Sequence, residues 1–326
     1  MMGKRLIRLG LLSLLLSLIM CGGSAFCQTC VIYPSSVSDI DVRHNDLIEI
    51  LTTALKKTIP GYGAFRVAPS KLKMNEVRSL TELMHNNAQS TTYNDACSDD
   101  SVNVVWSPTS EQLEQQLIPI RIPLRKGLLG LRIALIDAKN QATLDRVNTL
   151  ADLKKFKLGM GIGWVDLNVL KANDLNVVTA NYDALFAMTA RDRFDLFPRG
   201  INEVFNEYDQ RHAIYPNLAI EKNLLIYYPW PYYFFVNKNN RQLAERIQVG
   251  LEVMIDDGSF NRIFMKFNGA AIRRANLGSR RVIQLKNPFL PKKTPTNPRY
   301  WFFPKLIKNV KYILVAKALY FFTGYI

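Results

Sequence analysis

The strongest constraint on the fold is an alternation of short apolar strands with amphipathic helices, which occurs in two separate series. The first series predicts strands over 30–34, 64–70 and 102–106, and helices over 46–58, 75–85 and 110–117. Alternation of this kind is typical of an α/β lobe built on a largely parallel sheet. The apolar segment 127–137 then leads the chain out of this lobe.

The second series has the same pattern. Segment 157–173 reads as strand, glycine-rich turn and helix; 176–180 and 193–197 read as strands, and 182–191 and 201–211 as helices. The aromatic segment 224–238 predicts a strand pair interrupted by Pro229 and Pro231, which returns the chain to the first lobe. A helix over 240–258 ends at Gly258, and 259–267 predicts one or two further helical turns.

These elements divide the chain into five parts. We expect a signal peptide at 1–25, lobe one at 26–130 plus 228–270, and lobe two at 131–227. An extended basic segment over 271–304 would wrap the body, and a basic, apolar tail would occupy 305–326. Within the wrap, Trp301 and the phenylalanines are expected to anchor the chain.

The N-terminus has the composition of a secretory signal. Three cations precede the apolar run LGLLSLLLSLIM, and Gly23 and Ala25 are placed for cleavage before Phe26. The run is short for a membrane span. Lipoprotein anchoring at Cys21 is the less favoured alternative, because bulky Met20 precedes it. We therefore expect a periplasmic product.

Export makes a disulfide the expected use of the cysteines. A mature chain beginning at Phe26 would keep Cys27, Cys30 and Cys97, enough for one bridge and one further thiol. Cys30–Cys97 is the favoured pairing, because it would join a strand to a long loop. Cys27 and Cys30 have redox-motif spacing, but a structural or unpaired cysteine is favoured there.

The formal charge of +15 does not describe the folded body. Of the 42 Lys and Arg, three lie in 1–25 and twelve in 271–326, and neither segment contains an acidic residue. The remaining 27 basic residues face 27 acidic ones in 26–270. We therefore expect no nucleic-acid partner. The tail could contact a membrane surface, pack on the body as a helix, or stay poorly ordered.

Several motifs, in their order, resemble the bacterial extracellular solute-binding proteins of family 3, the amino-acid-binding substrate-binding proteins of ABC transporters. They are a strand ending in Tyr33-Pro34, a helix beginning Asp46-Leu47, VNVVW before Ser107-Pro108-Thr109, DLKKFKLGMGIG, DALFAMTARDRFDLF and LEVMIDDGSFNRIFMKF. The last three are similar to the family patterns DLKGKKVGVQAG, ALxxGRxDAV and DGTxxKIxxKW. The resemblance covers about residues 30–270.

The resemblance implies a type II periplasmic-binding-protein fold, with two α/β lobes joined by two crossover strands and a ligand in the cleft between them. It also implies closure about a hinge. The lead into the first helix, Val42-Arg43-His44-Asn45, departs from the family pattern, and so do the two positions that anchor the ligand in the family. Gln112 stands where the family has an arginine for the ligand carboxylate, and Pro198-Arg199-Gly200 stands where it has an aspartate for the ligand ammonium. These departures favour a ligand other than a free α-amino acid.

Ligands of open α/β sheets bind beyond the carboxyl ends of the strands. The strand ends here predict a ligand-binding set of aromatic rings, hydroxyls, a glycine turn with the helix N-terminus after it, and one cation: Tyr33, Trp106, Ser107, Thr109, Gly161, Gly163, Trp164 and Arg199. The rings could instead be core. Thr109 could cap a helix through a capping box with Gln112, and Arg199 could be a solvated charge or pair with Glu203.

The sequence thus predicts a periplasmic solute-binding protein for a small polar, anionic ligand, held by Arg199. We expect a monomer that needs no cofactor or metal and delivers the solute to an inner-membrane ABC permease or a sensor. Two rivals remain: a lyase or dehydratase on the same fold, using a pair such as Glu203 and His212, or a membrane-associated protein acting through its basic tail.

Overall fold

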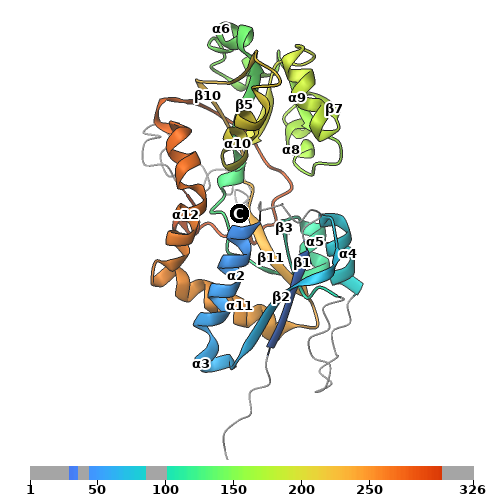
Figure 1. Ribbon diagram of the computed structural model, residues 1–326, viewed down its shortest axis with the longest axis vertical. Coiled ribbons are helices and arrows are strands. Elements are labelled where there is room, and N and C mark those ends of the chain that lie inside the picture. Colours follow the sequence, from blue (N-terminus) through green and yellow to red (C-terminus); the bar gives the residue numbers. More distant parts are fainter. Residues whose placement is uncertain (1–28, 36–43, 86–100, 303–326) are drawn as a thin grey trace, which may run out of the picture.

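The computed structural model describes residues 29–35, 44–85 and 101–302 of the 326-residue chain. The predicted signal peptide, the tail 305–326 and the thiols of Cys21, Cys27 and Cys97 lie outside these residues. Two α/β lobes stand one above the other, joined by a narrower middle (Figure 1). No helix among the described residues is long and apolar enough to cross a membrane.

Lobe one contains two sheets that lie side by side. β1 and β2 are parallel, and β11 lies between β3 and β4, antiparallel to both. Asn103 joins the two sheets, because its amide donates to Cys30 O and accepts from Ile32 N. The strand bounds are Thr29–Ser35 (β1), Phe65–Lys73 (β2), Val104–Pro108 (β3), Leu117–Ile120 (β4) and Tyr232–Asn237 (β11).

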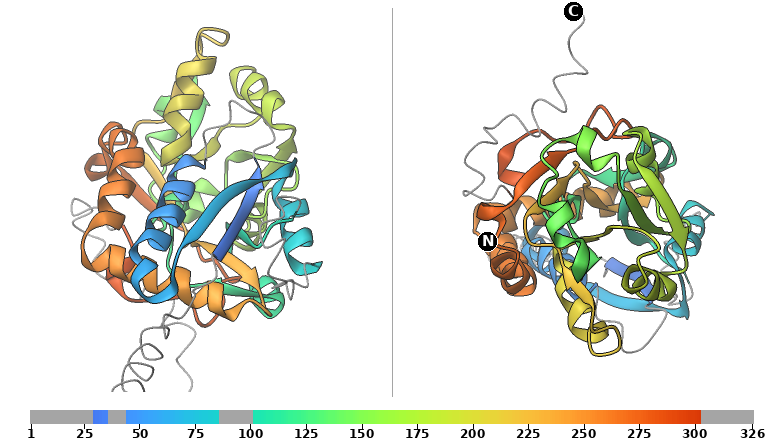
Figure 2. Two further views of the ribbon diagram at one scale, coloured as in Figure 1. Left: turned by 60° about the horizontal axis from the view of Figure 1, so that its bottom comes forward. Right: turned by 90° about the horizontal axis from the view of Figure 1, so that it is seen from above.

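Helices pack on both sides of these strands (Figure 2). They are α2 (Asn45–Lys57), α3 (Ile59–Tyr62), α4 (Glu76–His85), α5 (Glu111–Gln116), α11 (Arg241–Asp256) and α12 (Ser259–Arg274). α2 and α11 pack so closely that a Cβ atom at Gly250 would lie 2.2 Å from Ala54 O. α12 is longer than the sequence predicted, because its buried face continues beyond Phe264 to Asn268 and Gly269.

Lobe two is built in a similar way. β5 (Leu131–Asp137) is antiparallel to its partners β8 (Phe197–Gly200), β9 (Leu218–Ile220) and β10 (Leu224–Tyr227). β6 (Lys157–Gly161) and β7 (Asn176–Ala180) are parallel and reach the sheet through a bridge between Leu158 and Leu196. The helices are α6 (Gln141–Leu144), α7 (Leu150–Leu153), α8 (Leu167–Ala172), α9 (Tyr182–Ala190) and α10 (Ile201–Arg211).

Each lobe therefore has an inner antiparallel strand that directly follows a crossing from the other lobe: β11 in lobe one and β5 in lobe two. This arrangement confirms the predicted two-lobe α/β fold with its crossover strands. The two crossings touch at Gly130, which accepts a hydrogen bond from Tyr228 N and where a Cβ atom would lie 2.0 Å from Tyr228 O.

Two predicted elements are wrong in detail. The strand predicted at 193–197 lies over Phe197–Gly200 instead, so Pro198 and Arg199 are strand residues paired with β5 and not a turn. The segment predicted to be an extended wrap from 271 onward continues α12 to Arg274 and then forms β12 (Arg281–Gln284) parallel to β10. Within the described part of this segment, 271–302, the largely irregular portion runs from Leu285 to Phe302.

Candidate functional site

Aromatic side chains gather where β1 and β3 end in lobe one. The ring of Trp106 lies 5.9 Å from that of Tyr33 and 5.3 Å from that of His44, centroid to centroid. Trp106 is buried and also contacts Phe234, whereas Tyr33 is half-buried. Desolvation raises the pKa of the Tyr33 hydroxyl. The two predicted aromatic residues are thus neighbours, with Tyr33 as the accessible member.

The hydroxyls of Ser107 and Thr109 both donate hydrogen bonds to acidic side chains. Ser107 Oγ donates to Glu76 Oε1 at 2.7 Å, and Thr109 Oγ1 donates to Glu114 Oε1 at 2.7 Å. The predicted capping box of Thr109 and Gln112 is wrong, because Ser110 is the N-cap residue of α5 and accepts from Leu113 N.

In lobe two the turn that contains Gly161 and Gly163 positions the side chain of Trp164. A Cβ atom at Gly161 would lie 2.2 Å from the Trp164 indole, so only glycine allows the ring to cover this strand end. Gly163 has a φ of 79°, in the left-handed region that favours glycine. Trp164 stacks on Phe197 with centroids 6.2 Å apart.

The helix that follows this turn does not offer the anion site that the sequence predicted. α8 has only six residues, and its N-cap position is taken by Asp166. The Asp166 carboxylate accepts from Arg132 Nη2 at 2.7 Å and from the Tyr228 hydroxyl at 2.8 Å. A second anion would be repelled by the carboxylate already present.

Arg199 is an internal ion-pair residue. It is 6% exposed, and its guanidinium donates from Nε to Glu207 Oε2 and from Nη2 to Glu207 Oε1, both at 2.6 Å. Glu203 lies 3.1 Å from Nη2, and the Trp164 ring centroid lies 4.5 Å from Cζ. Burial lowers the pKa of this guanidinium, but the charges of Glu203 and Glu207 outweigh that effect and raise it.

Two further arginines line the crossings and were missed from the sequence. Arg125 donates two hydrogen bonds to Asp46, at 2.6 and 2.8 Å, and both side chains are buried. Arg132 lies on β5 beside Asp166, over the Tyr228 ring. Their position in the sequence could have indicated this role. Each arginine lies next to or within an apolar segment that joins the lobes, and a cation buried there needs a carboxylate partner.

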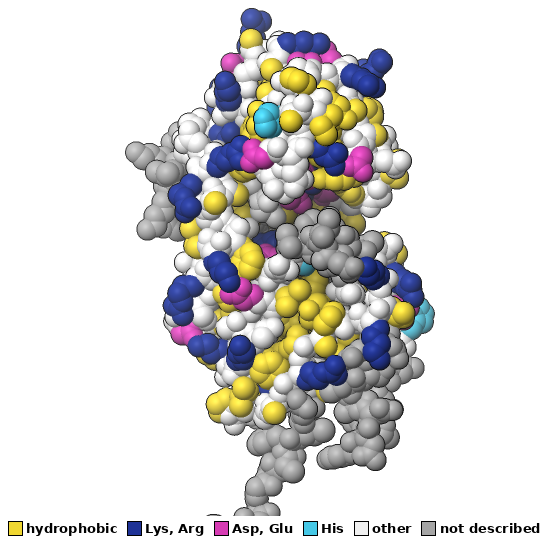
Figure 3. Space-filling model, viewed as in Figure 1, with side chains coloured by type: hydrophobic (Ala, Val, Ile, Leu, Met, Phe, Trp, Pro, Cys, Tyr) yellow, Lys and Arg dark blue, Asp and Glu magenta, His cyan; other side chains and the backbone are white. Residues whose placement is uncertain are grey.

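Two carboxylates, one from each lobe, each use only one of their oxygens in contacts with described residues. Glu203 lies in the first turn of α10, and its Oε2 accepts from Gly200 N. Glu76 is the first residue of α4, and its Oε1 accepts from Ser107 Oγ. Among the described residues, no hydrogen bond reaches Glu203 Oε1 or Glu76 Oε2. Acidic and basic side chains show at the indentation between the lobes (Figure 3).

The surroundings shift the pKa values of these two carboxyl groups in opposite directions. Burial alone raises the pKa of Glu203, but Arg199 and Arg132 outweigh it and hold the pKa below its usual value. Glu76 is exposed, yet nearby protein desolvates it enough to raise its pKa. Burial is the main cause of the raised pKa of Tyr232, and the negative charges of Glu76 and Glu203 raise it further. The two carboxylates thus act on the same hydroxyl from opposite lobes.

Among the described residues, the charged side chains gathered around the two crossings include more carboxylates than guanidiniums. Three guanidiniums, of Arg125, Arg132 and Arg199, face five carboxylates, of Asp46, Glu76, Asp166, Glu203 and Glu207. Each arginine has a carboxylate within salt-bridge distance. The expectation of an anionic ligand held by Arg199 finds no support in these contacts, which favour a cationic group.

No catalytic pair emerges from the residues proposed for a lyase. Glu203 and His212 are at opposite ends of α10, about 13 Å apart at 1.5 Å per residue. His212 stacks on Tyr208, with ring centroids 4.8 Å apart. Within the described ranges, no group of three or more His, Cys, Asp or Glu side chains is placed to hold a metal ion. Cys30 is in a disulfide, and its partner lies outside the described residues, so the pairing with Cys97 stays a prediction.

Comparisons with known proteins give structural matches only. No family model matches the chain, and no curated protein matches it. Among solved structures, an ancestral arginine-binding protein bound to arginine matches at 18% identity and a TM-score of 0.49, covering 74% of this chain and 99% of its own. An arginine-specific periplasmic binding protein of Salmonella typhimurium matches at 15% identity and 0.48, covering 73% and 99%.

A third match is a putative L-cystine ABC transporter protein from Listeria monocytogenes, at 16% identity and a TM-score of 0.46, covering 74% of this chain and 96% of its own. These structures belong to the group of amino-acid-binding, ABC-transporter proteins that the sequence motifs resemble. At TM-scores below 0.5 they carry no argument about this chain.

Proposed function

We propose that the protein is a two-lobe solute-binding protein that takes a small solute with a cationic group between its lobes. One observation carries this proposal: Glu76 and Glu203 approach the interlobe region from opposite lobes, and each keeps one carboxylate oxygen without a hydrogen bond from any described residue. A cation held between them would contact both lobes at once.

The remaining contacts support a cation over an anion. The three arginines are engaged by carboxylates, and among the described side chains around the crossings the carboxylates outnumber the guanidiniums. Half-buried Tyr33 and Trp164 add ring faces, which attract cations. The predicted ligand residues thus keep a role as walls of the site, whereas Arg199 becomes a support that positions Trp164 and α10.

The proposal extends to export and to partners. A signal at 1–25 would deliver the chain to the periplasm, where the bound solute would pass to an inner-membrane ABC permease or be presented to a sensor. The role is one of binding without chemistry, and the geometry of α10 disfavours the lyase alternative. The predicted membrane contact of the tail lies outside the described residues and stays a prediction.

A thermal-shift panel on the mature protein tests the charge preference. Arginine, lysine and putrescine represent cations, glutamine a neutral solute, and glutamate and succinate anions. Ligands that bind only the folded state raise the melting temperature. We expect a rise with at least one cation and none with the anions; a rise with succinate or glutamate alone would contradict the proposal.

The variant Glu203→Gln tests the residue. Loss of one charge-assisted hydrogen bond of about 1.5–3 kcal/mol would weaken binding of the cation about 10- to 150-fold. Asp174→Asn is the matched control, because its carboxylate is on the surface of the same lobe, with 82% of the side chain exposed. Equal affinity of Glu203→Gln and the native chain would remove Glu203 from the site.

A further inference from the structure

After the two crossover strands, the C-terminal part of the described chain passes between the lobes two more times. α12 begins beside α11 in lobe one and ends against lobe two, where Arg274 pairs with Asp209 of α10 and Ala275 joins the core. β12 then extends the sheet of lobe two, and residues 285–302 return to lobe one (Figure 1). Two connections beyond the crossover strands therefore tie the lobes together.

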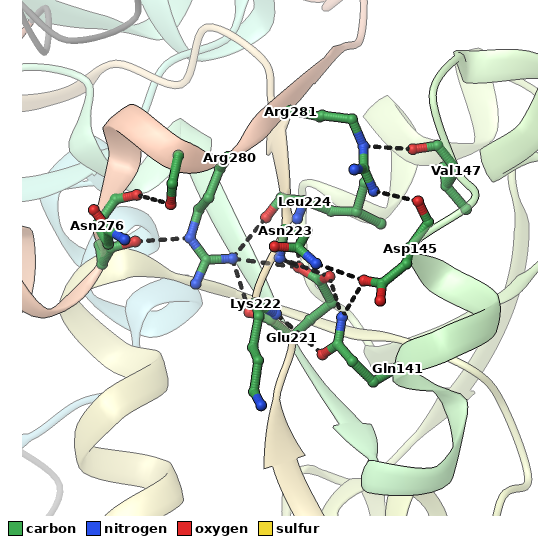
Figure 4. A network of polar contacts seen from close by, with 12 residues as sticks. Gln141, Asp145, Val147, Glu221, Lys222, Asn223, Leu224, Asn276, Arg280 and Arg281 are labelled. Atoms are coloured by element: carbon green, nitrogen blue, oxygen red, sulfur yellow. Dashed lines mark hydrogen bonds and ion pairs between the residues drawn. The ribbon is translucent and has the colours of Figure 1, made fainter.

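The start of this return segment is anchored firmly in lobe two. Arg280 Nη1 donates to Glu221 O at 2.7 Å and to Leu224 O at 3.0 Å, and the Glu221 side chain is fully buried (Figure 4). Arg281 donates to the backbone oxygens of Asp145 and Val147. Since cations held by buried partners are costly to release, β12 is a fixed part of lobe two.

The middle and end of the segment bind the backbone of both crossings. Asn287 Nδ2 donates to Pro229 O at 2.9 Å, and Phe302 N donates to Lys126 O at 2.7 Å. Buried Trp301 lies against Gly127, where a Cβ atom would come within 2.5 Å of the indole. Lys126 and Gly127 both have positive φ values and lie in the turn just before β5, on the chain that passes from lobe one to lobe two.

The segment is also anchored to lobe one. Lys292 N donates to Glu111 Oε1 at 3.0 Å. Arg299 Nη2 donates to Glu252 Oε2 at 2.9 Å and to Asp256 Oδ1 at 2.8 Å, and the Tyr300 hydroxyl donates to Glu252 Oε1 at 2.7 Å. These anchors lie on α5 and on α11, two separate elements of the lobe.

We propose that residues 280–302 form an interlobe brace that holds the two lobes at a fixed angle. Hinge closure depends on a few residues whose φ and ψ angles can change. Here the carbonyls of Pro229 and Lys126 are held by the brace, whose ends are fixed to opposite lobes, and the prolines at 229 and 231 restrict φ further. The lobes then present an already formed cleft.

Spin labels on the two lobes test the brace without any solute, so the outcome is independent of the proposed function. Exposed Thr81 on α4 and Lys171 on α8 are suitable sites. Labels attached through an encoded unnatural residue leave the cysteines intact. The native chain is expected to give one narrow distance distribution by double electron–electron resonance. A broad or two-peak distribution in the native chain would overturn the proposal.

Cutting the brace after folding provides the second arm. A recognition sequence for a specific protease is inserted after Phe289, which is 45% exposed, and in a control chain after Ile214, which is 64% exposed. Cleavage after Phe289 is expected to replace the narrow peak by a broader distribution with longer distances, and cleavage after Ile214 to leave it unchanged. A narrow peak that survives the first cut would refute the brace.

Discussion

At the scale of single residues, Arg199 shows what spacing can and cannot predict. The sequence indicated a cation at a strand end and offered Glu203 as an alternative partner. The structure adds Glu207, one helical turn beyond Glu203 on the same face of α10, as the bidentate partner. The i, i+4 spacing of the two glutamates could have signalled a paired cation. What the sequence could not show was that the strand ends at Gly200, which directs Arg199 toward that face.

Replacing Arg199 with alanine should therefore destabilise the fold. The change leaves Glu207 buried without its cation, for which we expect a loss of about 3–5 kcal/mol in the free energy of unfolding. Urea unfolding of the two chains measures it. The matched control is Arg78→Ala in the exposed pair with Glu82, where the expected loss is below about 0.5 kcal/mol. Equal midpoints for both variants would contradict a structural role for Arg199.

Glu203 predicts a dependence of stability on pH. Its pKa in the folded protein lies below the value of about 4.3 in the unfolded chain. The unfolded state then binds more protons in this window, so the contribution of Glu203 to stability is present above about pH 4.3 and lost as pH falls through the folded pKa. In acid titrations of unfolding, Glu203→Gln should lose less stability than the native chain. Parallel curves for the two proteins would argue against the lowered pKa.

At the scale of elements, the alternation of strands and helices predicted most of both lobes because period and turn residues agreed there. The strand at 193–197 was misplaced because Asp195 and Leu196 follow the alternating pattern. Asp195 instead accepts from Lys157 N, and ladder pairing with β5 starts at Phe197. β12 was missed because its short, basic sequence has no clear period. Its position depends on pairing with the far edge of β10. The site residues Arg125 and Arg132 depend likewise on tertiary contacts.

The packing of α11 on α2 gives a test of one element contact. Gly250→Ala would place a methyl group against Ala54 O, and overpacking of this kind costs about 1–3 kcal/mol. Gly269→Ala in α12 is the matched control, since its Cβ would lie 3.4 Å from flexible side-chain atoms and alanine favours helix by about 1 kcal/mol. In thermal unfolding, we expect Gly250→Ala to have a lower midpoint temperature than the native chain, and Gly269→Ala not to. A midpoint lowered equally by both would contradict the close approach of α2 and α11.

At the scale of the whole molecule, the proposed function depends on three features: two lobes, the carboxylates between them, and the brace that joins them. The motif resemblance implied a cleft that closes on its solute, whereas the brace predicts a cleft of fixed shape. Such a cleft would select solutes by charge and size without the additional selectivity of closure. The high net charge of the chain comes from its basic ends, 1–25 and 271–326, which contain no Asp or Glu. The carboxylates between the lobes therefore all belong to residues 26–270, where acidic and basic residues are equal in number.

The most direct test of the central claim is calorimetric titration of the mature protein with solute pairs matched in shape and differing in one charge. Suitable pairs are arginine with citrulline, lysine with norleucine, and putrescine with butanediol. For every pair in which binding is detected, the account predicts tighter binding of the cationic member, and loss of that preference in a Glu76→Gln, Glu203→Gln double variant. Tighter binding of the neutral member, or a preference that survives the double variant, would contradict it.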